Sequence, residues 1–285
     1  MRGRLYNWRV ALLWFALATA LLALLLRLVY LQLNAAGKGH AFLKRQGDIR
    51  VLSNEAIAAG RGEIRDRHGD LLAYSTPVQS VWLNPGVFEP SQQNLQALAA
   101  VLDTSVAQIK RRLAANQSFV FLRRQVEPAT AQAVLALGLN GVHAQAEYKR
   151  FYPAAEFAAH IVGFTDVEDR GQEGVELAFD HILQGQAGQR KVMRNALGET
   201  IKDIGLLKAA SSGGQLQLAI DMNLQYIAYR ELKAAVAEHD ARSGSLVILD
   251  VDTGEVLALV NQPSYNVNDR SQLLPARTRN RALID

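Results

Sequence analysis

The hydrophobic pattern of the chain begins with a long apolar run. Residues 10–33 contain a single charged side chain, that of Arg27. A helix of about 20 apolar residues spans the hydrocarbon core of a bilayer, and a long arginine side chain can extend its charge to the interface. Three arginines precede the run: Arg2, Arg4 and Arg9. By the positive-inside rule, the pattern predicts a single-pass signal anchor over residues 10–33, with residues 1–9 in the cytoplasm and the remainder exported.

Two other interpretations of this run are a cleaved signal peptide and a buried helix of a soluble core. Ala35 and Ala36 supply small residues of the kind that a cleavage site needs, but they follow an apolar stretch longer than most signal-peptide cores. Trp8 and Tyr30 stand where interfacial aromatic anchors are expected. We therefore favour an uncleaved anchor.

After the anchor, the pattern predicts short strands and helices joined by turns. Residues 38–59 are polar and weakly patterned, which indicates a stalk with some strand. The sequence His68-Gly69-Asp70 has the composition of a turn between two short strands. Apolar spacing and capping residues then predict helices at 91–102, 105–113 and 128–137, a helical segment at 175–183 and a strand pair at 191–204.

A linker of small residues, 209–214, marks a change of pattern and a predicted domain boundary. Beyond it the chain predicts a strand at 216–220, a helix that begins after the capping residue Asp221, and two apolar strands at 245–250 and 255–260. This order is the opening of an α+β domain. The predicted organisation is therefore a domain over residues 34–214 and the start of a second over residues 215–285.

The amino-acid composition excludes several kinds of catalytic and binding site. The 285 residues include no cysteine, which excludes a disulfide framework, thiolate metal sites and a cysteine nucleophile. The net charge of +4 permits an anionic partner, but the basic pairs lack the interleaved aromatic residues that stack on bases, so no nucleic acid is expected. No phosphate-binding glycine loop is present and the six histidines lack metal-ligand spacing. We expect no cofactor and no metal.

The sequence Asp252-Thr253-Gly254 has the form of an aspartic-protease active-site motif and is kept as a remote alternative. That chemistry needs a second aspartate or a dimer. A hairpin turn explains the same three residues more simply.

Serine acyl-transfer chemistry of the penicillin-binding type needs Ser-x-x-Lys and Lys-Thr-Gly. None of the eight lysines has a serine three residues earlier, and none precedes Thr-Gly. Ser264-Tyr265-Asn266 fits the remaining Ser-x-Asn motif by letters, but we interpret it as a loop. No catalytic residue is therefore assigned.

Four segments nevertheless resemble the landmarks of a known family, in the same order. The motif residues are Arg61, Gly62, Asp66, Arg67 and Gly69 in the first, Arg150, Tyr152 and Pro153 in the second, His160 and Gly163 in the third, and Gly171, Gly174 and Glu176 in the fourth. The chain resembles a class B penicillin-binding protein of the FtsI septal type, and residues 220–225 and 252–266 are similar to the start of its transpeptidase domain.

This resemblance implies an α+β protein with a single transmembrane helix, a pedestal (dimerisation) domain over residues 34–214, and the incomplete start of a β-lactamase-like transpeptidase domain. The nucleophilic serine of the family would lie just beyond Asp285. For the intact family member the resemblance implies D,D-transpeptidation of peptidoglycan stem peptides at the septum. The chain as given is expected to be inactive alone.

The resemblance also implies partners and roles. The protein is expected in the bacterial inner membrane, where it would dock a glycosyltransferase of the shape, elongation, division and sporulation (SEDS) family and other division proteins. Arg61, Asp66, Arg67, Arg150 and Glu176 resemble interdomain packing and salt-bridge residues of the family, although a purely fold-stabilising role stays open. A second hypothesis is a self-sufficient, membrane-anchored binding module without catalysis.

Overall fold

The computed structural model describes residues 2–33, 52–115, 119–194, 200–269, 271 and 273–284. The chain divides into two compact units, Met1–Asn54 with Lys191–Gly205 and Glu55–Arg190 with Leu206–Asp285. All candidate residues lie in the second unit. The predicted stalk falls largely outside the described residues, and the predicted domain limits remain a prediction.

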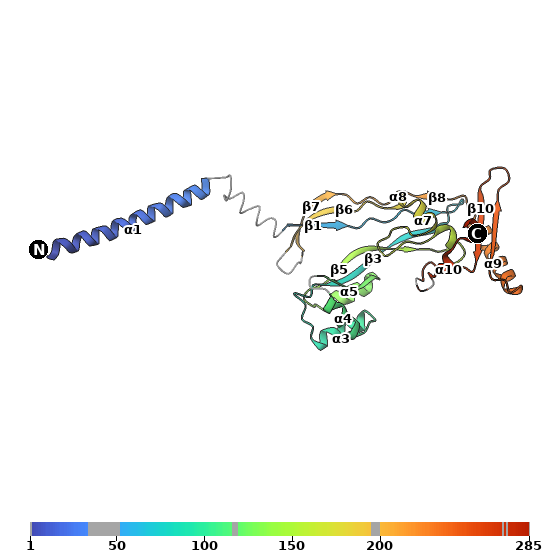
Figure 1. The fold of residues 1–285 in the computed structure, drawn as a ribbon, viewed down its shortest axis with the longest axis horizontal. Helices are drawn as coiled ribbons and strands as arrows, with labels where there is room; N and C mark the ends of the chain where they lie inside the picture. Colours follow the sequence, from blue (N-terminus) through green and yellow to red (C-terminus); the bar gives the residue numbers. More distant parts are fainter. Residues whose placement is uncertain are drawn as a thin grey trace. The chain divides into compact units, whose positions relative to one another are not determined.

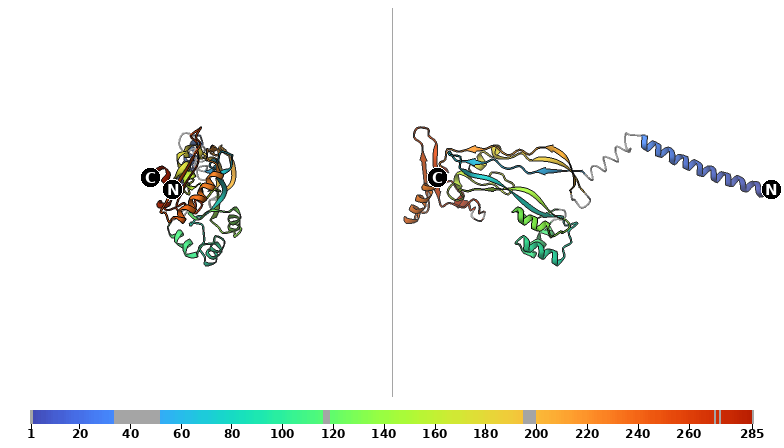
Figure 2. Two further views of the ribbon diagram at one scale, coloured as in Figure 1. Left: turned by 90° about the vertical axis from the view of Figure 1, so that its right-hand side faces the viewer. Right: turned by 180° about the vertical axis from the view of Figure 1, so that it is seen from behind.

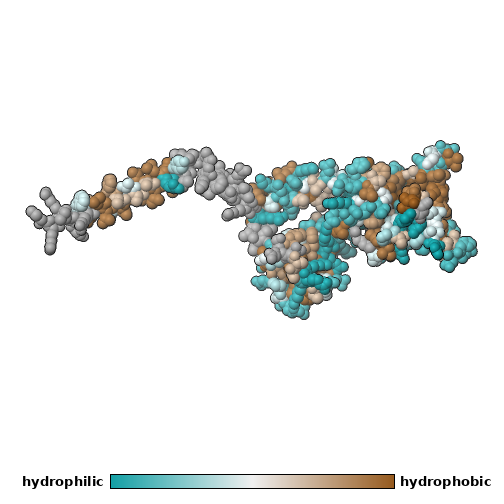
Figure 3. Space-filling view, viewed as in Figure 1, coloured by the Kyte–Doolittle hydropathy of each residue, from teal (hydrophilic) through white to brown (hydrophobic). Residues whose placement is uncertain are grey.

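The apolar run forms one helix, as its pattern predicts. Helix α1 covers Arg2–Leu33, and its segment Val10–Tyr30 is long and apolar enough to cross a membrane. None of that segment is buried. Apolar side chains cover most of its visible length in Figure 3. A helix that exposes such a surface in water needs either a protein partner or a lipid environment.

The second unit is built around a five-stranded sheet (Figure 1). Its strands are β2 Ile64–Arg65, β3 Leu71–Leu83, β4 Val120–Val126, β5 Val142–Phe151 and β8 Leu216–Gln217. The order is β4-β3-β2-β8, with β5 also paired to β3. Strand β3 is antiparallel to β5 along ten residues, whereas β2 is parallel to β8. Gly69 lies in the turn between β2 and β3 with a φ of +94°, as the turn prediction requires.

Three helices cover one face of β3, β4 and β5 (Figures 1 and 2). They are α3 Gln92–Val101, α4 Val106–Ala115 and α5 Pro128–Leu135. Ser91 and Ser105 cap the first two of these helices, because their hydroxyls accept backbone N–H groups three residues later. Helix α5 ends before the predicted limit at 137, and the chain then turns at Gly138 with a φ of +62°.

The next segment differs from its prediction. The helical pattern at 175–183 forms two short helices, α7 Gly174–Ala178 and α8 Asp180–Leu183, after α6 Ala159–Val162. Phe179 separates them with a φ of −111°, outside the helical range. The predicted strand pair is present as β6 Gly188–Arg194 and β7 Thr200–Lys208, which form a three-stranded sheet with β1 Leu52–Ile57.

The C-terminal region, residues 215–284, contains α9 Met222–Glu238 packed on an antiparallel hairpin of β9 Gly244–Leu249 and β10 Val256–Gln262. Asp221 caps α9 as predicted. The predicted strand at 216–220 is reduced to β8, and two four-residue helices follow the hairpin, α10 Pro275–Thr278 and α11 Arg281–Ile284. The Asp252-Thr253-Gly254 sequence lies in the exposed hairpin turn, where the Asp250 carboxylate accepts two of its N–H groups.

Candidate functional site

Three of the predicted motif residues form one buried ion cluster. The Glu176 carboxylate on α7 receives the Arg61 Nε on one oxygen, at 2.6 Å, and the Arg150 Nε on the other, at 2.7 Å. The side chains of Arg61 and Glu176 are fully buried, and that of Arg150 is 2% exposed. Two charge-assisted bonds thus join Glu176 to residues 115 and 26 positions away in the sequence, in a dry environment. We call Arg61, Arg150 and Glu176 the ion cluster.

Further bonds hold the Arg61 guanidinium in place. Its other nitrogens donate to the Glu176 carbonyl at 2.8 Å and to the Asp169 carbonyl at 3.0 Å, and its Nη1 lies 2.8 Å from the Asp180 carboxylate. Burial lowers the pKa of Arg61, but the charges and hydrogen bonds of Glu176 and Asp180 outweigh that effect and raise it. Arg61 is therefore a permanent buried cation that links the segment before strand β2 to α7 and α8.

The predicted glycines make this arrangement possible through close backbone packing. A Cβ on Gly163 would fall on the carbonyl of Glu173, and one on Gly171 would fall on the carbonyl of Glu176. Gly163 and Gly174 also have φ values of +75° and +60°. Side chains at these positions would push α7 away from α6 and withdraw the Glu176 carboxylate. Gly62 packs in the same way against the carbonyl of Gly214.

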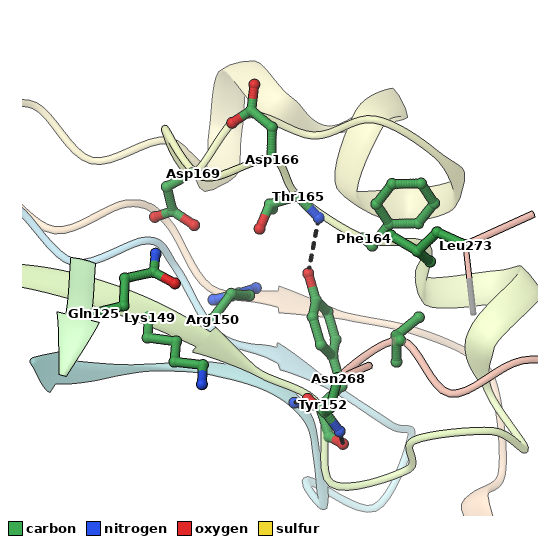
Figure 4. A pocket seen from close by; sticks show the side chains of 11 residues that line it. Gln125, Lys149, Arg150, Tyr152, Phe164, Thr165, Asp166, Asp169, Asn268 and Leu273 are labelled. Carbon is green, nitrogen blue, oxygen red and sulfur yellow. Dashed lines mark hydrogen bonds between the residues drawn. The ribbon is translucent and has the colours of Figure 1, made fainter. Parts of the chain in front are cut away.

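A small polar cavity of about 40 Å³ adjoins the ion cluster (Figure 4). The Tyr152 hydroxyl accepts the backbone N–H of Thr165 there at 3.1 Å. Arg150 Nη2 is buried and has no hydrogen-bond partner among the described residues. Burial raises the pKa of Asp169, which also lines the cavity, to about 6, although the charges of Arg61 and Arg150 oppose the shift. A cavity of this size holds water but not a substrate.

A second group of motif residues joins the β2–β3 turn to α9. The buried Asp66 carboxylate accepts the backbone N–H groups of His68 and Asp70 on one oxygen and that of Met222 on the other. Met222 is the first residue of α9, so Asp66 supplements Asp221 as a cap from outside the helix. Asp221 in turn lies 3.1 Å from His68.

The neighbouring Arg67 extends this contact. Its N–H donates to the Ile220 carbonyl at 2.9 Å, and its guanidinium lies 3.5 Å from Glu255 at the start of the β9–β10 hairpin's second strand. Both side chains are substantially exposed, at 34% and 46%, so the ion pair contributes little. The backbone bond is the part of this contact that fixes the position of Ile220.

The segment 152–160, which we call the strap, runs along the C-terminal region. The Tyr152 backbone exchanges two hydrogen bonds with the Asn268 amide, at 3.1 and 2.9 Å. The Gln225 Nε2 on α9 donates to the Phe157 carbonyl at 2.5 Å, and the Ser264 hydroxyl donates to the Glu156 carbonyl at 2.7 Å. The strap therefore binds α9 and the loop after β10 through backbone groups.

The C-terminal end of the strap carries the motif residue His160. His160 is buried, and its Nε2 lies 2.8 Å from the Arg277 carbonyl in α10. The Tyr265 hydroxyl donates to the neighbouring Ala159 carbonyl at 3.2 Å. Pro153 is exposed at the other end of the strap. Of the thirteen predicted residues, the structure thus brings three into the ion cluster and places Asp66, Arg67, Tyr152 and His160 against the C-terminal region.

The sequence did not single out several polar residues that complete this junction. Gln225 is fully buried: besides the Phe157 bond, its amide donates to the Leu259 carbonyl and accepts the Leu259 N–H. One signal was available, since Gln225 is a polar residue one turn from the buried Ala228 on an otherwise apolar helix face. Asn268 lies in a loop without such a pattern. Within the described part of the chain, no cluster of three or more histidine, aspartate or glutamate residues could hold a metal ion.

Comparison with known protein families identifies this architecture. The model of the penicillin-binding protein dimerisation domain matches residues 56–218, which include the ion cluster and the strap. The chain belongs to the penicillin-binding protein family. We call the matched part, residues 56–218, the dimerisation domain.

Curated relatives agree along the chain. It is 40% identical to the probable peptidoglycan D,D-transpeptidase PbpC of Pseudomonas aeruginosa, and the match covers 100% of this chain and 50% of the relative. It is also 40% identical to the peptidoglycan D,D-transpeptidase FtsI of Escherichia coli K12, covering 98% and 48%. The chain thus spans about half the length of the curated relatives it matches, and the class B, FtsI-type resemblance is confirmed.

Solved structures show the same fold. A penicillin-binding protein 2 in complex with MreC from Helicobacter pylori matches with a TM-score of 0.56 and 24% identity, over 76% of this chain and 44% of that one. Penicillin-binding protein 2X from Streptococcus thermophilus matches with a TM-score of 0.55 and 20% identity, over 79% and 37%. The predicted α+β class, with an apolar N-terminal helix before a penicillin-binding-protein dimerisation domain, is therefore confirmed.

Proposed function

We propose that this chain supplies the membrane anchor and the rigid support of a septal peptidoglycan D,D-transpeptidase, and that its motif residues hold the start of the transpeptidase domain in place. One observation carries the proposal: the motif segments at 66–70 and 152–160 bind the C-terminal region through backbone and buried side-chain hydrogen bonds. Specific, buried bonds of this kind fix a relative position more firmly than an exposed ion pair does.

In this proposal the motif residues of the dimerisation domain fix the position of the C-terminal region and take no part in the chemical reaction. Asp66 and Asp221 together satisfy N–H groups at the start of α9, which fixes where that helix begins. Gln225 then connects α9 to both the strap and the edge of β10. The ion cluster resists distortion because its three charged side chains are buried, and loss of the Glu176 carboxylate would remove the shared partner of both guanidinium groups.

The bond-forming chemistry lies outside the residues present here. Acyl transfer to a serine enzyme needs an activated nucleophile and donors aimed at the oxyanion. The sequence contains neither Ser-x-x-Lys nor Lys-Thr-Gly. In a protein that carries those motifs, the serine would attack the D-Ala-D-Ala bond of one stem peptide, release D-alanine, and pass the acyl group to an amine of a neighbouring strand.

The proposed location is the bacterial inner membrane, with the short N-terminus in the cytoplasm and the bulk of the chain in the periplasm. The apolar helix α1 and the arginines before it support this orientation. The proposed partners are a SEDS-family glycosyltransferase and other division proteins. A precedent for partner binding is the Helicobacter pylori relative, which is described as a complex with MreC.

A chimaera tests the proposal. Residues 1–284 are joined, at the aligned position, to the remaining part of Escherichia coli FtsI and expressed in cells depleted of that protein. We expect restored division and covalent labelling by a fluorescent penicillin, whereas the unmodified chain should take up no label that survives denaturation. A chimaera with its appended serine changed to alanine is the control.

Two results would contradict the proposal. A chimaera that reaches the membrane and binds penicillin but leaves the cells filamentous would argue against a septal role. A stoichiometric penicillin band on the unmodified chain would overturn the assignment of a non-catalytic role. The alternative of a self-sufficient binding module predicts that the unmodified chain, expressed beside an intact division transpeptidase, blocks division by competing for its partners.

A further inference from the structure

The last described segment of the chain, residues 275–284, is held in an unusual way. It contains α10 and α11, helices of four residues each, and neither contains a buried residue. Leu274, Leu283 and Ile284 are between 52% and 71% exposed. A single helical turn is not stable by itself. The small apolar area that this segment buries is not enough to stabilise it. Polar contacts must therefore determine the path of this segment.

A continuous set of polar groups makes those contacts. Asn261 on β10 is fully buried. Its Oδ1 accepts the Ala282 N–H of α11 at 2.8 Å, and its Nδ2 donates to the Asn280 Oδ1 at 2.9 Å. The Asn280 Nδ2 donates to the carbonyl of His160 at 3.3 Å. We call His160, Asn261 and Asn280 the polar relay.

The His160 ring closes the relay on the other side. Its Nε2 faces the Arg277 carbonyl, which can only accept, so the ring must carry its proton on Nε2 and donate it. Burial lowers the pKa of His160, and the nearby charge of Arg281 adds to this effect, while the hydrogen bond to Arg277 opposes it. The neutral ring packs edge-to-face against Tyr265, with 5.2 Å between the centroids. The Tyr265 contact, which lies outside residues 275–284, thus helps to hold the His160 ring in place.

We propose that the polar relay is a positioning element through which α6 of the dimerisation domain and β10 set the path of residues 275–284. The proposal rests on the proposed function, in which the motif residues hold the start of the transpeptidase domain in place. Each end of the segment has its own link: His160 holds α10 through Arg277, and Asn261 holds α11 through Ala282. Asn280 connects the two links.

Hydrogen exchange of the unmodified chain and its variants, followed by mass spectrometry, tests the relay without any measurement of catalysis. The reporters are the hydrogen-bonded N–H groups of this segment: Arg277, Thr278, Ala282, Leu283 and Ile284. His160→Leu removes the donor. His160→Gln keeps a donor near the position of Nε2. His68→Leu removes a histidine contact at the other junction, with Asp221, and is the matched control.

We expect His160→Leu to speed exchange of the reporters about fivefold, the equivalent of one neutral hydrogen bond. His160→Gln and His68→Leu should stay within about twofold of the parent chain. Equal rates in His160→Leu and the parent would overturn the proposal, as would failure of His160→Gln to restore protection. Since no step depends on transpeptidation, failure here leaves the proposed function standing.

A second variant covers the case in which His160→Leu disturbs α6 itself. Asn280 lies in the turn between α10 and α11 and is only partly buried, so Asn280→Ala should leave the dimerisation domain folded. We expect the same local acceleration in the reporters and unchanged exchange in β3 and β5. Unchanged exchange of the reporters in Asn280→Ala would overturn the relay whatever His160→Leu does.

Discussion

At the scale of single residues, Glu176 has the most demanding environment. One carboxylate serves two guanidinium groups, and all three side chains are buried. Glu176 alone does not balance both arginine charges; Asp180 also pairs with Arg61, and Asp169 interacts with the charges of Arg61 and Arg150. Removal of the shared carboxylate would leave two buried cations facing one another. The stability of the dimerisation domain therefore depends on this one side chain.

We predict that Glu176→Gln lowers the free energy of unfolding by about 3–5 kcal/mol, the usual effect of breaking a buried ion pair. Glu231→Gln is the matched control, because Glu231 forms a pair with Arg230 in which both side chains are 61% exposed. That change should cost less than about 1 kcal/mol. Urea unfolding in detergent, followed by circular dichroism, measures both. A similar decrease in the free energy of unfolding for the two variants would show that the buried ion cluster stabilises the chain no more than an exposed ion pair does.

Asp169 occupies a position that glycine fills in a related turn. In both 66–70 and 166–170 the leading aspartate carboxylate accepts the N–H groups two and four residues later, and its backbone pairs with the fifth residue. The fourth residue has a positive φ in each: +94° at Gly69 and +62° at Asp169. Asp169 therefore combines an unfavourable backbone conformation with a partly buried carboxylate of raised pKa.

We predict a pH-dependent gain in stability for Asp169→Asn. Because folding raises the pKa of Asp169 from 3.8 to about 6, the unfolded chain releases the proton first, and stability falls as the pH rises between these values. Asparagine carries no charge and tolerates positive φ. The variant should exceed the parent by about 2 kcal/mol at pH 7.5 and lose this advantage towards pH 4. Urea unfolding at both values measures the difference, and an advantage that does not change with pH would refute the carboxylate as its cause.

At the scale of elements, close backbone packing between α6 and α7 places Glu176. Two of the motif glycines, Gly163 and Gly174, have positive φ, and neither position has room for a Cβ. Short helices of four and five residues hold their relative position here through close backbone contact, in addition to the apolar cluster that includes Ala159, Val162 and Val175. The geometry of the ion cluster is therefore sensitive to single methyl groups.

We predict that Gly163→Ala destabilises the chain by more than about 3 kcal/mol, since the methyl group would overlap the Glu173 carbonyl and the residue would keep a positive φ. Gly138→Ala is the control: Gly138 has a similar φ of +62°, but nothing lies within 4 Å of its would-be Cβ. Gly138→Ala should lower the free energy of unfolding by only about 1 kcal/mol, because it adds the strain of a positive φ without a steric overlap. Thermal unfolding of both variants separates the steric effect from the backbone effect, and equal losses would contradict it.

Local signals predicted most elements, and long-range contacts explain the exceptions. The capping serines at 91 and 105 and Asp221 act within one helical turn, so their sequence positions sufficed. The pattern at 175–183 keeps helical spacing although Phe179 leaves the helical conformation. Asn261 and Asn280 could not be identified, because their role depends on partners brought together only by the folded chain.

At the scale of the whole second unit, apolar burial is uneven. Fourteen buried residues pack between α3, α4, α5 and the sheet, whereas the cluster between α9 and the hairpin contains four, Ala228, Tyr229, Ala258 and Val260. On β9 and the turn after it, Val247, Leu249 and Val251 are 45%, 55% and 97% exposed. The hydrogen bonds of the strap and the polar relay stabilise only the side of the C-terminal region that faces the dimerisation domain. Its far side should open more easily than the dimerisation domain.

Limited proteolysis with trypsin tests that difference. Arg242 is exposed in the loop between α9 and β9, while Arg170 is exposed in the tight turn beside the ion cluster. Trypsin cleaves where the chain opens locally, and opening around Arg242 disrupts the smaller apolar cluster. Within the second unit we therefore predict cleavage after Arg242 before cleavage after Arg170, with the fragment that precedes Arg242 persisting. Arg242→Gln should delay loss of the intact unit. Earlier cleavage after Arg170 would mean that the ion cluster, despite its buried charges, is the less stable of the two regions.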